Sequence, residues 1–151
     1  MKEHSEQRQA LTAILFSNVG HSFSHMFTLL YATAVLYLPK VFGIPYGELL
    51  ALSSLGLILF GVAALPAGWL ADRWSQIGMM VIFFGGIGAG AIVVGLAEGP
   101  KAIFVGLTLI GLFASIYHPV GIAWVVAWAK QQGMTLGING VFGNAGSAIA
   151  P

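Results

Sequence analysis

The sequence predicts an all-α membrane protein whose helices form an antiparallel transmembrane bundle. Of its 151 residues, 58% are hydrophobic and only 7% are charged, whereas a soluble domain carries about 25% charged residues. Long apolar runs alternate with short turns that contain polar residues, glycine or proline. Each run of roughly 20 apolar residues is long enough to cross the hydrocarbon of a bilayer as a helix. Lipid is therefore the expected solvent and the first expected partner.

The composition also excludes several kinds of site. Six basic residues against five acidic ones give a net charge of +1, which offers no basic surface for nucleic acid. The absence of cysteine excludes disulfides, thiolate nucleophiles and cysteine-based metal sites. The sequence contains no phosphate-binding loop and no recognisable pair of nucleophile and base. We therefore expect no enzyme activity, no cofactor and no bound metal.

Residues 1–10 are polar and mixed in charge, and we expect them to form an N-terminal cytoplasmic tail before a transmembrane domain over residues 11–151. The expected helices span residues 11–38, 46–70, 77–97, 101–129 and 134–151. We expect the last helix to be incomplete and the chain to be part of a longer protein. Pro66 should bend the second helix, and the spacing Gly86-x-x-x-Gly90 should let another backbone approach the third.

The basic residues predict an orientation in a cell membrane, which the chain would cross several times. If the N-terminus is cytoplasmic, the basic residues expected inside are Lys2, Arg8, Arg73 and Lys130, and those outside are Lys40 and Lys101. The excess on the inside favours this orientation.

Polar side chains mark one face of the first helix. They recur at i, i+4, i+7 and i+11 and at neighbouring positions: Ser17, Asn18, His21, Ser22, Ser24, His25 and Thr28. A polar face on a spanning helix is expected to line a water-filled path or a buried interface. Helical rise places both His21 and His118 about 15 Å from the cytoplasmic ends of their helices. We therefore predict that His21, His25 and His118 converge near the membrane midplane, on a path for substrate or protons.

Pro119 follows His118 and has no N–H, so the carbonyl of Ser115 loses its usual donor. A free carbonyl beside an imidazole suits the binding of a proton or a substrate. The alternative is a simple kink in which a neighbouring helix satisfies the carbonyl by a hydrogen bond. The polar side chains of the first helix, likewise, could serve only as hydrogen bonds between helices. A metal on the three histidines is less favoured, because it requires close convergence and usually a carboxylate that supports the ligands.

The residues between the second and third helices read Gly68-Trp69-Leu70-Ala71-Asp72-Arg73. They resemble the signature loop of the major facilitator superfamily, Gly-x-Leu-Ala-Asp-Arg-x-Gly, with Ser75 in place of the second glycine. The resemblance implies that Gly68, Leu70, Ala71, Asp72 and Arg73 form a cytoplasmic gate. The alternative is that Asp72 only caps the third helix, where a carboxylate complements the helix dipole.

A second set of residues resembles the fosmidomycin-resistance-like branch of that superfamily. It consists of the His118-Pro119 pair and of a glycine-rich helix-packing motif, Gly137, Gly140, Gly143, Asn144, Gly146 and Pro151. The resemblance implies the first part of a six-helix half in a twelve-helix secondary transporter. It also implies that the first and fourth helices line the path and that small organic compounds are exported in exchange for protons.

Two other functions remain open from the sequence. A non-transporting multi-pass membrane scaffold or assembly subunit would need a partner to cover the polar face of the first helix. A small four-helix multidrug transporter is less favoured, because the first helix has no carboxylate within its apolar run. The major-facilitator transporter implied by the resemblance would need other partners: a small-molecule substrate, protons and the remaining helices of the longer protein. The sequence leaves the substrate, the direction of transport and the coupling ion open.

Overall fold

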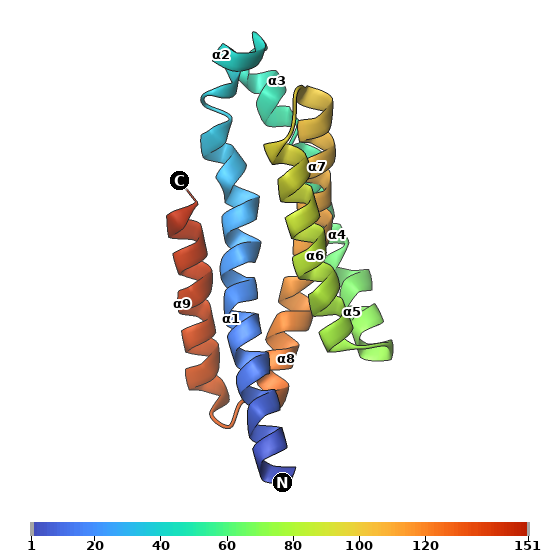
Figure 1. The fold of residues 1–151 in the computed structure, drawn as a ribbon, viewed down its shortest axis with the longest axis vertical. Helices are drawn as coiled ribbons and strands as arrows, with labels where there is room; N and C mark the ends of the chain where they lie inside the picture. The colour runs from blue at the N-terminus through green and yellow to red at the C-terminus, as the bar shows by residue number, and fades with distance from the viewer. Residues whose placement is uncertain (1, 151) are drawn as a thin grey trace.

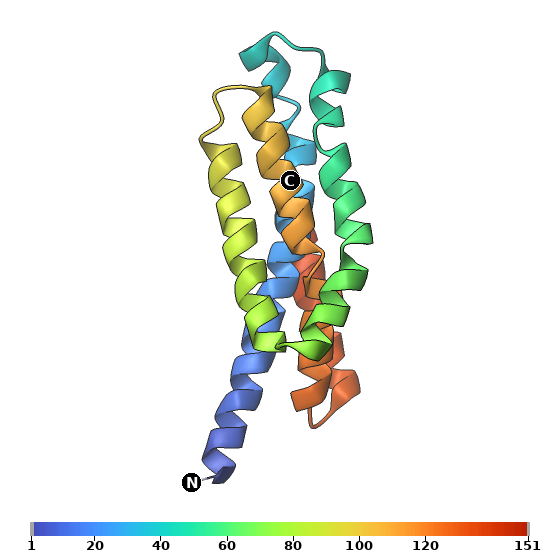
Figure 2. The same cartoon turned by 90° about the vertical axis from the view of Figure 1, so that its right-hand side faces the viewer.

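The computed structural model describes residues 2–150, which form an elongated bundle of helices without a strand in that range (Figure 1). Its elements are α1 (Lys2–Ala34), α2 (Leu38–Phe42), α3 (Tyr46–Ala51), α4 (Ser54–Val62), α5 (Ala64–Arg73), α6 (Gln76–Gly95), α7 (Pro100–Ala114), the π-helical turn η1 (Tyr117–Gly121), α8 (Ile122–Trp128) and α9 (Gln132–Ile149). The long segments run up and down the bundle in turn, as Figures 1 and 2 show from two sides. The all-α, antiparallel fold expected from the sequence is confirmed.

The first helix differs from its prediction at both ends. Residues 2–10, expected to form a tail before the helix, belong to α1. They are rich in Lys, Glu, Gln and Arg, which favour helix, and contain neither glycine nor proline. The helix ends at Ala34 rather than at residue 38. Pro39 then lies in the first turn of α2, and Gly43 ends α2 in a left-handed conformation with φ of 66°.

The second predicted helix is broken into α3, α4 and α5. The segments Tyr46–Val62 and Ala64–Arg73 meet at an angle of 42°. Pro66 lies just after this break and has no N–H to donate to the carbonyl of Val62, four residues earlier. The bend predicted at this proline is therefore confirmed.

The motif from Gly68 to Arg73 is helical, whereas the sequence suggested a turn. It forms the last part of α5, and only Trp74 and Ser75 connect α5 to α6. The hydroxyl of Ser75 accepts a hydrogen bond from the backbone N–H of Gly78 at 3.0 Å. Ser75 is thus the N-cap of α6, and the alternative role of Asp72 as the cap is wrong.

The glycines of α6 allow α7 to approach closely. A Cβ atom on Gly90 would stand 3.0 Å from the carbonyl oxygen of Gly106, and one on Gly106 would stand 2.9 Å from the carbonyl oxygen of Gly90. A Cβ atom on Gly86 would overlap the ring of Phe113. The close approach predicted from the spacing of Gly86 and Gly90 is therefore confirmed, and α7 is the helix that approaches.

The fourth predicted helix changes its winding at Pro119. The α-helical hydrogen bonding of α7 stops at Ala114, and the chain passes through η1 before α8 resumes it. Such a turn holds an extra residue and often occurs at functional sites. The hydroxyl of Ser115 donates to the carbonyl of Leu112 at 2.6 Å, on its own helix. The proline therefore distorts the helix as predicted, and it does so as a π-helical turn.

By length and composition, two helices of residues 2–150 are long and apolar enough to cross a membrane, and a bent pair makes a third. These are α6, the continuous segment Pro100–Trp128, and the pair Tyr46–Val62 with Ala64–Arg73. The remaining long helices, α1 and α9, are not apolar enough to be counted as spans, because their histidines, serines, asparagines and glycines lower the mean hydropathy. They lie side by side in the bundle (Figure 1), so each covers part of the polar face of the other.

Candidate functional site

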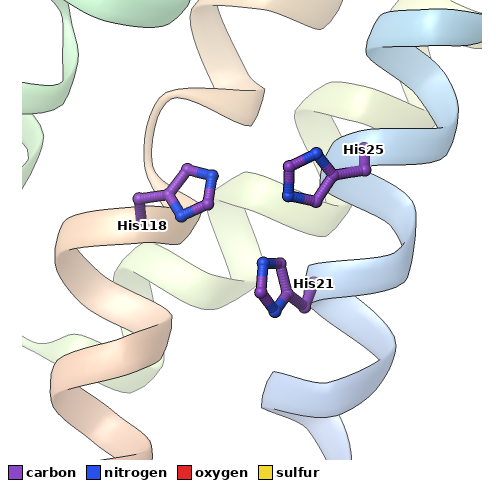
Figure 3. A group of neighbouring side chains, drawn as sticks. All are labelled: His21, His25 and His118. Carbon is purple, nitrogen blue, oxygen red and sulfur yellow. The ribbon is translucent and has the colours of Figure 1, made fainter. Parts of the chain in front are cut away.

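Three histidines meet inside the bundle. His21 and His25 come from α1 and His118 comes from η1, and Figure 3 shows their rings facing one another. One nitrogen of each ring lies within 4.8 Å of the corresponding nitrogens of the other two. The ring centroids are 5.0 Å apart for His21 and His25 and 5.5 Å apart for each of them with His118. The convergence predicted from the sequence is therefore present. We call these three residues the histidine cluster.

Local structure explains how the histidine cluster forms. His21 and His25 are four residues apart, so they lie one turn apart on the same face of α1. η1 places His118 opposite this face, beside the buried ring of Tyr117. All three histidines keep part of their surface exposed. The group contains no carboxylate among the residues that the structure describes.

The ring of His21 is held on three sides. Its Nδ1 atom lies 2.8 Å from the carbonyl oxygen of Asn139 on α9. Because a carbonyl oxygen only accepts hydrogen bonds, Nδ1 carries the proton and, in the neutral ring, Nε2 keeps its lone pair. The ring also stacks on Tyr117, with centroids 4.8 Å apart. On the α9 side, Gly143 is so close that a Cβ atom there would stand 2.6 Å from Nε2.

A buried hydrogen-bond network lies next to the histidine cluster. The side-chain amide of Asn139 donates to Oδ1 of Asn18 and to the hydroxyl of Tyr117, each at 2.9 Å. Ser17 donates to the carbonyl of Gly121 at 2.8 Å, so its oxygen is free to accept from Tyr117 at 3.2 Å. The four side chains in this network are all buried. The network therefore joins α1, η1 and α9, and it gives Ser17 and Asn18 a role in packing.

Two residues of this arrangement were absent from the predicted site. They are Tyr117 and Asn139. A sequence signal for Asn139 exists, because it stands four residues before Gly143 and seven before Gly146, on one face of α9. That face lies against α1.

The glycine-rich motif of α9 divides into two parts. Gly143 packs against His21, and a Cβ atom on Gly146 would overlap the backbone of Ser22. A Cβ atom on Gly137 or on Gly140 would meet nothing within 4 Å among the described residues. Asn144 is exposed, and Pro151 lies outside the described residues. Of the described residues of this motif, only Gly143 and Gly146 thus pack α9 against another helix.

The other hydroxyl groups on the polar face of α1 differ in their hydrogen-bond partners. Thr28 donates to the carbonyl of Ser24 in the preceding turn, and Ser22 donates to the carbonyl of Phe142 on α9 at 2.7 Å. The hydroxyl of Ser24 is buried and has no hydrogen-bond partner among residues 2–150. Part of the polar face of α1 therefore packs against α9, and part of it contributes His21 and His25 to the histidine cluster.

The proposed gate motif lies at the end of α5. Asp72 and Arg73 are exposed, and neither forms an ion pair with a side chain of residues 4–150. The guanidinium of Arg73 instead lies 4.2 Å from the centre of the Trp69 ring. Gly68 touches the distorted turn, since a Cβ atom on it would stand 3.2 Å from Cβ of Pro119. The motif therefore contacts the element that carries His118.

Comparison with known proteins places the chain in a family. The sequence pattern of the Major Facilitator Superfamily matches residues 16–151. The Probable nitrate/nitrite antiporter NarK1 of Thermus thermophilus is 32% identical over an alignment of 133 residues, and the alignment covers 82% of this chain and 29% of that protein. The chain thus spans less than a third of this relative, and no solved structure matched it. With a match over nearly its whole length, the chain belongs to the major facilitator superfamily.

Proposed function

We propose that the chain is the first part of a secondary transporter in which the histidine cluster lines the substrate path. Family membership supports a membrane transporter rather than an enzyme. We infer the location of the path from one observation: three partly exposed imidazoles, two from α1 and one from η1, meet inside the bundle. Ionisable side chains within spanning helices usually mark the route of a substrate or ion.

The roles of the predicted path residues follow from their contacts. His21, His25 and His118 keep exposed surface and face one another, so they are the groups that contact the substrate. The buried side chains of Ser17 and Asn18 hold α1 against η1 and α9. We assign them to the support of the path rather than to its surface.

The transported compound in this proposal is a small organic molecule that is exported in exchange for protons. This narrower function rests on the resemblance to the fosmidomycin-resistance-like branch, which the residues Tyr117-His118-Pro119 and Gly143-Asn144-x-Gly146 carry. The complete transporter would add further helices to those of residues 2–150.

Exchange of nitrate and nitrite is a second candidate. The name of the Thermus thermophilus relative favours it. The histidine cluster is also compatible with an anion, because imidazoles can donate hydrogen bonds and the group contains no carboxylate in the described part of the chain.

We also propose that the N-terminus is cytoplasmic and that the membrane is the cell membrane. One end of the bundle holds the start of α1, the α5–α6 turn and the α8–α9 turn, and the other end holds α2 and the start of α7 (Figure 1). The first end carries Lys2, Arg8, Arg73 and Lys130, and the second carries Lys40 and Lys101. This distribution supports the orientation through the excess of basic residues inside. Gly68, Leu70, Ala71, Asp72 and Arg73 would then form a cytoplasmic gate, with partners for the two charged residues on further helices.

Transport by the native full-length protein in proteoliposomes tests this function. We would impose a pH gradient and follow the accumulation of labelled fosmidomycin and, separately, of nitrate. Gradient-driven accumulation of fosmidomycin is expected, and His118→Gln should reduce it by roughly tenfold or more through loss of a polar contact to the substrate. His4→Gln is the matched control, because His4 is exposed near the start of α1.

The other outcomes discriminate between the proposals. Accumulation of nitrate without fosmidomycin would favour the second candidate function. Transport that persists unchanged after the pH gradient is collapsed would exclude coupling to protons. If neither compound accumulates, the transporter proposal is contradicted, and co-purification of a distinct membrane protein would support the scaffold instead.

A further inference from the structure

We propose that His21, His25 and His118 bind a divalent transition-metal ion of the Zn²⁺ class. The histidine cluster supplies three imidazole nitrogens that all lie within 4.8 Å of one another. Two come from positions one helical turn apart on α1, and the third comes from η1 on the opposite wall. The proposal goes beyond transport, because it concerns an equilibrium binding site and holds for whichever compound the protein carries.

The first ligand is already oriented for a metal. Nδ1 of His21 donates to the carbonyl oxygen of Asn139, and Nε2 is the nitrogen turned toward His25 and His118 (Figure 3). Metal-binding histidines usually donate their second N–H in this way, to a carboxylate or to a backbone carbonyl. The carbonyl of Asn139 therefore provides the support that the sequence did not reveal.

The other two ligands have room to adjust. Nitrogens bound to Zn²⁺ at 2.0–2.1 Å in a tetrahedral site stand about 3.3 Å apart, so the longest separation in the histidine cluster must shorten by roughly 1.5 Å. The rings of His25 and His118 are partly exposed, and neither is hydrogen-bonded within residues 2–150. We expect rotation of these two rings toward a fixed His21 to supply this shortening.

The ligand set selects the class of metal. Imidazole nitrogens suit Zn²⁺, Cu²⁺ and Ni²⁺, whereas Mg²⁺ and Ca²⁺ require oxygen ligands. Three protein ligands leave one tetrahedral position for water or for another molecule. Because no carboxylate belongs to the group within the described residues, the bound ion keeps its positive charge and favours an anion at that position.

Titration of Zn²⁺ alone into the native full-length protein in detergent tests this site. We expect one Zn²⁺ per chain, and we expect His25→Gln and His118→Gln each to weaken its affinity at least tenfold. His4→Gln should bind as the native protein does, because the fourth histidine lies outside the histidine cluster. The described chain has no thiol that could bind Zn²⁺ instead.

Thermal unfolding provides an independent measurement. Zn²⁺ should raise the melting temperature of the native protein and of His4→Gln, as any ligand specific for the folded state does. It should not raise that of His25→Gln, whose melting temperature without metal shows whether the variant is folded. Co²⁺ should show the intense visible absorption of a tetrahedral complex with the native protein.

The proposal is overturned if the native protein does not bind Zn²⁺, if both cluster variants bind it as tightly as the native protein, or if His4→Gln abolishes binding. An equal effect of Mg²⁺ on the melting temperature would also overturn it. None of these measurements requires transport. Failure to bind Zn²⁺ therefore leaves the transporter proposal standing, and failure to transport leaves the metal site standing.

Discussion

Gly143 of α9 and His21 of α1 lie in contact with no space for a methyl group between them. A Cβ atom on Gly143 would stand 2.6 Å from Nε2 of His21 and 2.7 Å from Cε1. The missing side chain of Gly143 therefore sets where the imidazole lies and how closely the two helices approach.

Gly143→Ala should accordingly destabilise the protein. The added methyl group must displace the His21 ring or separate the helices, and overpacking of this kind costs about 1–3 kcal/mol. Thermal unfolding in detergent measures the effect. Gly140→Ala is the control on the same helix, because its Cβ atom meets nothing within 4 Å. Equal melting temperatures of the two variants would show that the contact does not constrain the bundle.

Asn139→Ala tests the network between α1, η1 and α9. The substitution removes the donor to Asn18 and to the hydroxyl of Tyr117 and leaves both groups buried. A buried polar group without a partner costs about 1–3 kcal/mol. Asn144→Ala, at an exposed position five residues further along α9, should change the unfolding free energy by less than about 0.5 kcal/mol. An Asn139 variant as stable as the Asn144 variant would mean that the network contributes no stability.

Gly111→Ala should disrupt the contact between α4 and α7. A Cβ atom at this position would overlap the carbonyl oxygen of Gly56, which is backbone and cannot rotate away. We expect a loss of about 3 kcal/mol, in the upper part of the range for overpacking. Gly61→Ala on α4 is the matched control, since nothing lies within 4 Å of its Cβ atom. The comparison is again made by thermal unfolding, and a Gly111 variant that melts with the Gly61 variant would refute the close approach.

Ser75→Ala and Asp72→Asn separate capping from gating. Ser75 accepts the hydrogen bond from Gly78, so its loss should cost about 1 kcal/mol of stability. Asp72 is exposed, and Asp72→Asn should change stability by less than about 0.5 kcal/mol while it reduces transport through the proposed gate. A larger loss of stability from the Asp72 variant than from the Ser75 variant would reverse these roles.

Helical periodicity was sufficient to predict the histidine cluster. The spacing of His21 and His25 placed them on one face, and the helical rise placed His118 at the same depth. The carbonyl of Asn139 could not be found in this way, because contacts between helices depend on their rotation and offset, which no single helix reveals. For the same reason, the glycine spacing of α9 does not distinguish Gly137 and Gly140 from Gly143 and Gly146, although only the latter two face α1.

The helices extend beyond their predicted bounds at the start of α1 and at the end of α5. Residues 2–10 favour helix by composition, and nothing in them stops α1. Leu70, Ala71 and Arg73 favour helix as well, and the first effective stop after them is the cap at Ser75. The π-helical form of the turn after Ile116 had no sequence signal beyond Pro119, since a proline is compatible with either a kink or an inserted residue.

We expect the contact between Gly68 and Pro119 to couple the position of α5 to the binding of a molecule at His118. Pro119 follows His118 directly, so any displacement of α5 at Gly68 must either move this turn or be resisted by it. A molecule held by His118 would therefore bias the position of α5, and the position of α5 would change the affinity for that molecule by the same factor. Because the coupling is reciprocal, Gly68→Ala should alter the affinity of the histidine cluster for that molecule, although Gly68 contacts none of the three imidazole rings.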